Sequence, residues 1–199
     1  MITLGITGGI GSGKSFVSQH FTKQNIPYYN CDERSKLLIN TNTQIINGLT
    51  SRFGAKIYND GKVNKALLAQ IIFNDKNELL FINNLIHPIV KADFEQWRNT
   101  QNTPFVVVES AILIESGFYR FCDKILVVEA PLELRIKRVA ERDKLTQEQV
   151  QARVKNQISD AGRRKFANFV IVNDGITNIA NVTNEIIEQL RNKYKIRQL

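Results

Sequence analysis

A glycine-rich octet near the N-terminus constrains the fold of this chain more than any other feature. Residues 8–15 read Gly-Gly-Ile-Gly-Ser-Gly-Lys-Ser and fit the pattern G-x-x-x-x-G-K-[ST] without a mismatch. The apolar run Ile2–Thr7 before them predicts a strand, and residues 14–23 after them predict a helix. A strand, a glycine turn and a helix in this order indicate a phosphate-binding loop (P-loop) in an α/β fold.

The residue types of the P-loop suit a polyphosphate ligand. Glycines permit positive φ angles and close backbone approach, so successive N–H groups can surround phosphate oxygens, and the helix N-terminus adds its dipole. Lys14 can bridge the β- and γ-phosphates, and the Ser15 hydroxyl can ligate Mg²⁺. We therefore predict that the chain binds a nucleoside triphosphate with Mg²⁺. The predicted nucleotide-binding residues here are Gly8, Gly9, Ile10, Gly11, Ser12, Gly13, Lys14, Ser15 and Phe16.

The rest of the chain predicts more strands of one parallel sheet. Three apolar, β-branched runs at 105–108, 124–128 and 169–172 alternate with helical segments, as in a sheet covered on both faces. Residues 32–97 have helical periodicity instead and interrupt this alternation. The predicted fold is an α/β P-loop core with three α/β/α layers, a helical insertion and a helical lid. The predicted bounds are 1–30 and 104–199 for the core, 31–103 for the insertion and about 138–165 for the lid.

The net charge of +8 agrees with anionic ligands, and its distribution narrows the choice among them. Between Pro131 and Lys165, ten basic residues face five acidic ones, which favours a lid that closes over ATP; the alternative is a solvated surface. The apolar stretches are too short for a bilayer, and the N-terminus does not resemble a secretory signal. Cys31 and Cys122 lie far apart in the sequence, as is common for reduced thiols. We expect a cytoplasmic protein.

The motifs favour a small-metabolite kinase among P-loop proteins. A GTPase would carry a D-x-x-G switch followed by an N-K-x-D motif, and the sequence has neither. A basic nucleic-acid-binding protein would have aromatic residues interleaved with a basic stripe, whereas the tyrosines here are scattered. Another nucleoside or nucleotide kinase with the same core stays open from these features alone.

Several short segments, in the same order, match one family of such kinases. They are Leu4–Ser15 around the P-loop, Cys31-Asp32, His87-Pro88, Ile112–Gly117, Arg142-Asp143, Gln157 and Ala167–Gly175. Over nearly its whole length the chain resembles the dephospho-coenzyme A kinases. Four positions depart from the pattern of that family, namely Asn30, Glu109, Ala111 and Asn168.

The resemblance implies a reaction. ATP would donate its γ-phosphate to the 3′-hydroxyl of the ribose of dephospho-CoA, giving coenzyme A and ADP. The implied ligands are ATP, Mg²⁺ and dephospho-CoA, with neither nucleic acid nor membrane as a partner. The resemblance also implies that the helical insertion accepts dephospho-CoA.

The candidate catalytic residues are Lys14, Asp32 and Arg142. Asp32 follows a second short strand that the sequence predicts at Ile26–Asn30, and there it can orient the acceptor hydroxyl and take its proton. The alternative is a helix N-cap, a position that aspartate favours. Arg142 can bind phosphate oxygens bidentately in the lid. The alternative is an exposed arginine in the last turn of a helix, where a cation suits the dipole.

The remaining candidate residues concern the substrates and the metal. We expect His87 and Glu115 to contact the acceptor, although Pro88 after His87 also indicates a helix boundary or kink. Glu109, at the end of a central strand, is expected to hold Mg²⁺ together with Ser15 or to order the P-loop; a strand-end charge is the alternative. We expect the side-chain amide of Asn173 to hydrogen-bond to the edge of the adenine base. The alternative is a structural role of Asn173 in a turn.

Overall fold

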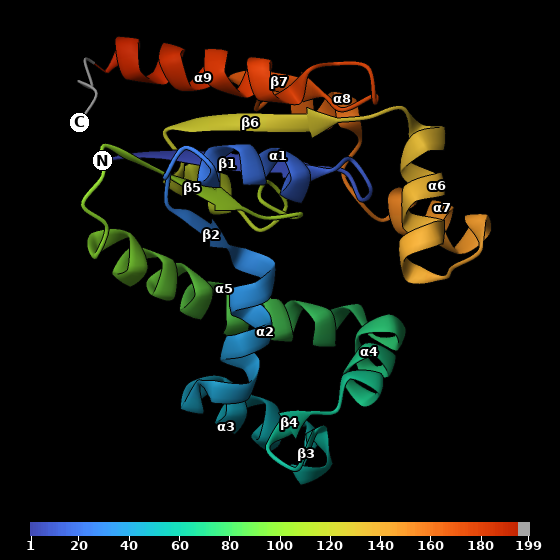
Figure 1. Cartoon of the computed structure of the whole chain (residues 1–199). Coiled ribbons are helices and arrows are strands. Elements are labelled where there is room, and N and C mark those ends of the chain that lie inside the picture. Colours follow the sequence, from blue (N-terminus) through green and yellow to red (C-terminus); the bar gives the residue numbers. More distant parts are fainter. Residues whose placement is uncertain (195–199) are drawn as a thin grey trace. The chain divides into compact units, whose positions relative to one another are not determined.

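The computed structural model describes residues 1–194 and separates into two compact units (Figure 1). The first unit contains residues 1–29 and the chain from residue 101 onward, and the second contains residues 30–100. Among the described residues, no helix combines the length and apolar character needed to cross a membrane.

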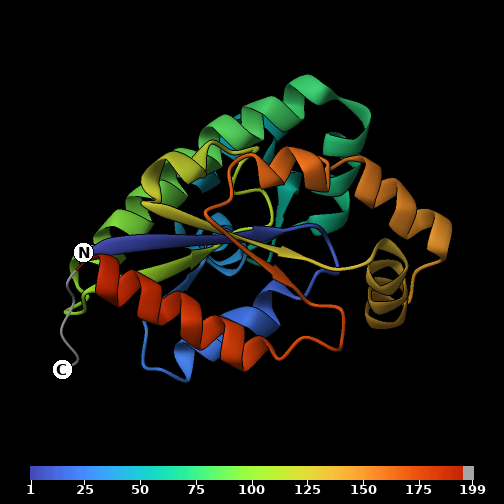
Figure 2. The ribbon, with the colours of Figure 1, turned by 90° about the horizontal axis from the view of Figure 1, so that it is seen from above.

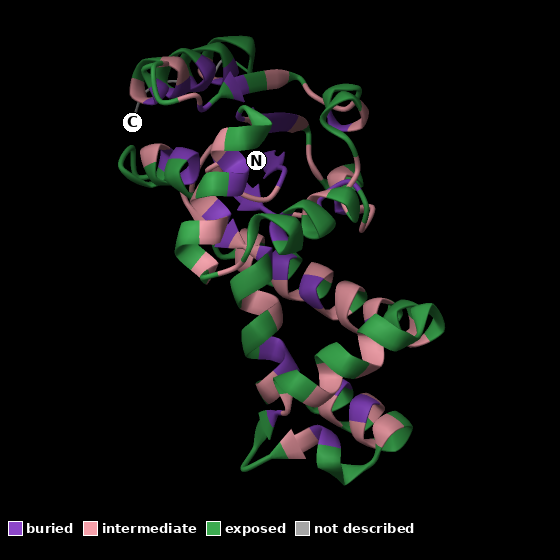
Figure 3. Cartoon of the chain, turned by 90° about the vertical axis from the view of Figure 1, so that its right-hand side faces the viewer, coloured by how far each residue is buried: buried purple, intermediate pink, exposed green. Residues whose placement is uncertain are grey.

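A five-stranded sheet organises the first unit and confirms the α/β prediction. The strand order is β2-β5-β1-β6-β7, and β1 pairs in parallel with β5 and β6, as β6 does with β7. The strand bounds are β1 Ile2–Gly8, β2 Tyr28–Asn30, β5 Phe105–Glu109, β6 Lys124–Glu129 and β7 Phe169–Val172. Figure 3 shows the central strands in purple, and every residue of β1 and β5 is buried. Continuous apolar runs suit strands covered on both faces.

The register of the sheet places the P-loop at the carboxyl ends of its central strands. Ile6 pairs with Glu109 and Gly8 pairs with Val128, so β1, β5 and β6 all end close to where the loop begins. Ligands of open α/β sheets bind at this edge.

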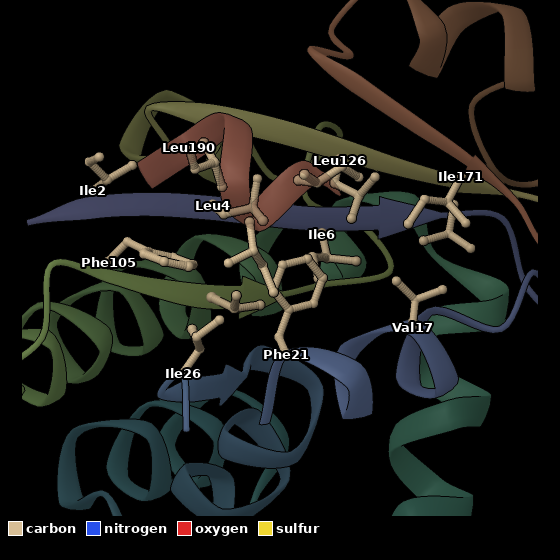
Figure 4. Close-up of a cluster of buried hydrophobic side chains, with 14 of the residues drawn as sticks. Ile2, Leu4, Ile6, Val17, Phe21, Ile26, Phe105, Leu126, Ile171 and Leu190 are labelled. Carbon is tan, nitrogen blue, oxygen red and sulfur yellow. The ribbon is translucent and has the colours of Figure 1, made fainter. Parts of the chain in front are cut away.

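One face of the sheet carries the main hydrophobic core, shared by two helices. Helices α1 (Lys14–Thr22) and α9 (Ile179–Lys193) contact each other and lie along the same side of the sheet (Figure 2). Phe21 and Leu190 from these helices pack with Leu4 of β1, and the three side chains are almost completely buried (Figure 4). Burying each such side chain contributes about 1.5–3 kcal/mol, so this core holds α1, and with it the P-loop, against the sheet.

Shorter elements complete the first unit. Gly5 on β1 leaves room for the segment after β5, because a Cβ at Gly5 would lie 2.7 Å from Cys122 Sγ and 2.8 Å from Leu113 Cδ2. Ile136 and Val139 of α6 pack with Val150 of α7 in a small separate cluster. The bounds are η2 Phe118–Phe121, α6 Leu132–Asp143, α7 Gln147–Lys155 and α8 Asp160–Arg164.

The second unit is mainly helical, with one short hairpin that periodicity did not predict. Strands β3 and β4 have two residues each and are joined by Asp60-Gly61, both with positive φ. An Asp-Gly pair is a strong hairpin signal that the helical interpretation of residues 32–97 overlooked. The bounds are α2 Cys31–Thr41, α3 Thr43–Phe53, η1 Ala55–Ile57, β3 Tyr58–Asn59, β4 Lys62–Val63, α4 Lys65–Asn74 and α5 Lys76–Asn99.

Pro88 predicted a helix boundary or a kink, and the boundary is wrong. Pro88 lies inside α5, which runs from Lys76 to Asn99. Proline removes one N–H donor from a helix, which costs stability. Buried contacts of Ile82, Val90 and Phe94 along α5 are the type of tertiary packing that overrides such a local preference.

Candidate nucleotide-binding and catalytic site

The P-loop has the backbone geometry that its glycines predict. Gly11 and Gly13 have φ values of 77° and 89°, in the left-handed region, and Gly13 is the N-cap of α1. The Ser12 N–H donates to the Gly9 carbonyl over 3.1 Å, which closes the turn. The Lys14 ammonium donates to the Gly8 carbonyl over 3.1 Å and so folds back along the loop. This arrangement keeps the lysine charge beside the N-terminus of α1.

Two side chains from distant segments press against the loop glycines. A Cβ on Gly9 would collide with the Arg135 guanidinium, and a Cβ on Gly13 would collide with the Asn173 amide. These positions therefore require glycine for space, and Gly13 also requires it for its φ angle.

We expect Gly13→Ala to weaken ADP binding at least tenfold, because alanine adds strain at positive φ and displaces Asn173 from the loop. Isothermal titration with ADP and Mg²⁺ measures the effect. Gly61→Ala is the matched control, since Gly61 has a φ of 73° with open space around it. Equal ADP affinity in the two variants would contradict the packing argument.

Glu109 connects β5 with the start of α1. Its carboxylate accepts hydrogen bonds from Ser15 Oγ at 3.3 Å, Ser18 Oγ at 2.8 Å and Tyr28 OH at 2.5 Å, and the residue is only 4% exposed. The structure thus brings Glu109 and Ser15 together, and the role of Glu109 in holding Mg²⁺ or ordering the P-loop stays a prediction. Hydroxyl and carboxylate oxygens are also the ligand types that Mg²⁺ prefers.

Asn173 supports the P-loop from the end of β7. Its side-chain N–H donates to the Ser12 carbonyl over 2.9 Å, and its backbone N–H donates to the Glu129 carbonyl over 2.7 Å. Arg138 in turn donates to the Asn173 carbonyl over 3.1 Å. Since the Asn173 amide nitrogen is engaged with the loop, its observed contacts are structural; adenine recognition stays a prediction.

A cavity of about 560 Å³ lies beside the P-loop in the first unit. Phe16, half exposed, and His20 form part of its wall, with their rings in edge-to-face contact at 5.1 Å. Burial and nearby Lys23 lower the pKa of His20, which favours its neutral form. The lining residues are Gly13, Phe16, His20, Arg138, Asn173, Gly175, Thr177, Asn178, Ile179 and Ala180. A largely apolar wall next to a phosphate loop suits a purine base.

The arginines in contact with the loop region are not the one selected from sequence. Arg135 donates to the Ile10 carbonyl over 2.9 Å, and Arg138 contacts Asn173. Arg142 instead binds the adjacent Asp143 carboxylate over 2.7 Å, a bond that raises the pKa of Arg142. The three-residue spacing of Arg135 and Arg138 predicts a shared helix face, but the sequence did not show that this face meets the loop.

Glu115 has contacts with the segment that follows α7. Its carboxylate accepts the Ile158 N–H at 3.3 Å and lies 4.0 Å from the Arg163 guanidinium. Contact with the acceptor stays a prediction for Glu115. Gln157, beside Ile158, accepts the Ile10 N–H at 2.8 Å, so a residue that in the sequence only matched the family pattern contacts the P-loop.

Asp32 and His87 belong to the second unit. Asp32 is exposed in the first turn of α2, directly after β2. The N-cap of this helix is Asn30, whose side-chain oxygen accepts the Asp32 and Glu33 N–H groups at 3.0 and 3.1 Å. The alternative interpretation of Asp32 as the N-cap is therefore wrong. Asn30, which departs from the family pattern, thus has a local function as the N-cap of α2, a position that asparagine favours.

His87 predicts a specific dependence of stability on pH. Burial lowers its pKa, so acidification below about pH 6.5 protonates the unfolded chain in preference to the folded one. We expect the melting temperature to decrease from about pH 7.5 to about pH 5.5, and to decrease less in His87→Gln. Thermal unfolding at both pH values measures this. An identical decrease of the melting temperature in the wild-type protein and in His87→Gln would show that folding does not change the pKa of His87.

Comparison with known proteins gives a consistent family assignment. A family model described as dephospho-CoA kinase matches residues 2–178. A dephospho-CoA kinase of Bacteroides fragilis is 43% identical over 175 residues, which cover 87% of this chain and 85% of the relative. One from Porphyromonas gingivalis is 37% identical over 194 residues, covering 97% and 96%.

Solved structures agree. The Thermus thermophilus protein TT1252 has a TM-score of 0.84 at 27% identity, with coverage of 99% of this chain and 98% of that chain. A dephospho-CoA kinase from Campylobacter jejuni has a TM-score of 0.70 at 25% identity, covering 96% and 98%. A shikimate kinase from Acinetobacter baumannii shares the fold, with a TM-score of 0.58 at 17% identity. The match covers 99% of this chain and 96% of that chain.

Proposed function

The chain belongs to the dephospho-CoA kinase family, and from this premise we propose how its residues carry out the reaction. Members of the family phosphorylate dephospho-CoA with ATP in the last step of coenzyme A synthesis, and this is the reaction of the chain. The observation that supports the residue assignment best is the packed P-loop, with Lys14 along the loop and Glu109 bonded to Ser15.

We propose that ATP lies with its phosphates in the P-loop and its base in the adjacent cavity. The N–H groups at the start of α1 and the Lys14 ammonium then surround the phosphate oxygens and neutralise the charge that develops during transfer. Phe16 offers an apolar contact to the base, and Asn173 fixes the loop beneath it.

We propose Ser15 and Glu109 as the residues that hold Mg²⁺. Their oxygens lie 3.3 Å apart, and both are hard donors of the type that Mg²⁺ accepts. Bound there, Mg²⁺ would supply positive charge to the β- and γ-phosphates. The hydrogen bonds from Ser15 and Ser18 to Glu109 also fix the first turns of α1 against the end of β5.

We propose that the second unit accepts dephospho-CoA and that Asp32 is the general base. Asn30 caps the first turn of α2, and Asp32 in this turn is exposed. There the carboxylate can accept the proton of the 3′-hydroxyl while the oxygen attacks phosphorus. His87 and Glu115 are proposed contacts of the acceptor.

We propose Arg142 as a lid residue that meets the phosphates when residues 138–165 close over ATP. Its guanidinium is about two-thirds exposed, so exchange of the Asp143 carboxylate for phosphate oxygens requires little rearrangement. Arg138, which contacts Asn173, lines the cavity and is a second arginine proposed to contact the nucleotide.

We further propose that the partners are small molecules and that the protein is cytoplasmic. Cys31 and Cys122 are both thiols, which agrees with a reducing compartment. The basic residues at 131–165 then serve phosphorylated substrates and not nucleic acid. A DNA-binding titration against salt tests this point, because sub-micromolar affinity with a steep salt dependence would contradict it.

The test of the proposed function is ADP release in the presence of purified components. ADP should form only when Mg²⁺, ATP and dephospho-CoA are all present. Its formation should stop after addition of EDTA and should resume with excess Mg²⁺. ADP formation that is independent of dephospho-CoA would contradict the acceptor assignment. Full activity in EDTA would contradict the metal assignment.

A further inference from the structure

Both backbone polar groups of Ile10, at the tip of the P-loop, are held by side chains from distant parts of the chain. The Ile10 N–H donates to Gln157 Oε1 over 2.8 Å, and Arg135 Nε donates to the Ile10 carbonyl over 2.9 Å. A loop tip normally bonds to water, whereas here two side chains fix its position and direction.

The Arg135 side chain, which holds the Ile10 carbonyl, is itself held in place by an ion pair with Asp160. Arg135 is only 2% exposed, and its Nη1 donates to both carboxylate oxygens of Asp160, at 2.8 and 3.1 Å. Asp160 also accepts a hydrogen bond from Arg163, which is 1% exposed. Charge-assisted bonds of buried arginines are strong and directional, so this side acts as a fixed support.

Gln157 lies in the connection between α7 and α8. Asn156 is the C-cap of α7, and Ser159 is the N-cap of α8. The neighbouring Ile158 N–H is bonded to Glu115, which anchors the connection to the segment after β5. Gln157 thus gives the proposed lid segment, residues 138–165, a polar contact with the P-loop, beside the apolar packing of Ile10 against the cluster that contains Val139 and Val150.

We propose that Gln157 is a positioning residue for phosphoryl transfer: by accepting the Ile10 N–H, it holds the P-loop in the path that directs the later N–H groups toward the nucleotide phosphates. This inference rests on the proposed function, since it requires ATP as the ligand of the loop. Gln157 itself acts through the loop backbone. Loss of the bond leaves the Arg135 hydrogen bond and the packing of Ile10 against the cluster that contains Val139 and Val150, and removes the contact that fixes the direction of the Ile10 N–H.

The test compares Gln157→Met, which keeps the length of the side chain but lacks an acceptor, with Gln157→Glu, which keeps an oxygen at the same reach. Loss of one such hydrogen bond should lower kcat/KM for ATP about tenfold in Gln157→Met and raise the dissociation constant for ADP by a similar factor. The KM for dephospho-CoA should stay unchanged. Gln157→Glu should retain most of the activity, and Gln189→Met, at an exposed position of α9, is the control.

The outcomes separate a positioning role from a structural one. A lower melting temperature of Gln157→Met with unchanged kcat/KM and ADP affinity would overturn the proposal. So would a Gln157→Glu variant as defective as Gln157→Met. ADP titration needs no acceptor, so it decides the role of Gln157 even if wild-type protein failed to turn over dephospho-CoA, the result that would refute the proposed function.

Discussion

Replacement of Lys14 by methionine is expected to lower kcat about 10³-fold and is the most damaging single change in the P-loop. The Lys14 ammonium lies next to the N-terminus of α1, and in the proposed reaction it neutralises the charge of the transferred phosphoryl group. Methionine keeps most of the side-chain volume but removes that charge. Initial rates of ADP formation at saturating ATP and dephospho-CoA measure the loss.

Two comparisons make the Lys14 experiment specific. Lys193→Met, at an exposed position near the end of α9, removes the same charge elsewhere and should leave kcat unchanged. The melting temperature of Lys14→Met should stay close to the wild-type value, because the hydrogen bond of Lys14 to the Gly8 carbonyl is only partly buried. A kcat within tenfold of wild type would show that Lys14 does not stabilise the transition state.

Asp32→Asn is expected to lower kcat by about 10² to 10⁴-fold, the range that general-base catalysis contributes. Asparagine keeps the shape of the side chain but cannot accept a proton from the acceptor hydroxyl. The backbone consequences should be small, because Asn30 and not Asp32 caps α2. The decisive measurement is the kcat of the purified variant together with its melting temperature.

Glu33→Gln controls for a change of charge in the same helical turn. Glu33 is exposed, and like Asp32 its backbone N–H is bonded to Asn30, so it shares the local environment of the helix start. Its neutralisation should leave kcat within about twofold of wild type. Comparable rates in Asp32→Asn and Glu33→Gln would exclude Asp32 as the base and leave only an electrostatic effect of the first turn.

The fold was predictable to a large extent because it depends on local patterns. The glycine spacing of the P-loop predicted the turn between β1 and α1, and the apolar runs predicted β5, β6 and β7 with small errors at their ends. Local signals also misled in one place. Pro88 indicated a helix boundary or kink, but α5 continues through it, because packing along α5 offsets the stability lost with the missing N–H donor. The Asp60-Gly61 hairpin had a signal that helical periodicity concealed.

The surroundings of the P-loop were harder to predict because they depend on contacts distant in sequence. Glu109 and Ser15 could be expected at the same edge of the sheet, since Glu109 ends a predicted central strand and Ser15 ends the P-loop after the first strand. Arg135 and Gln157 lie 125 and 147 positions from Ile10, and a sequence pattern gives no information about which polar side chain will meet which peptide. Arg142, selected for its place in the lid, is bonded to Asp143.

The identity of the phosphorylated product tests the central claim most directly. The protein is incubated with Mg·ATP and dephospho-CoA, and in parallel with AMP, adenosine or shikimate, and each product is analysed by mass and by the position of its phosphate. We predict coenzyme A phosphorylated at the 3′-hydroxyl, formed in equal amount with ADP, and little turnover of the other acceptors. Unmodified dephospho-CoA together with consumption of another acceptor would contradict the account.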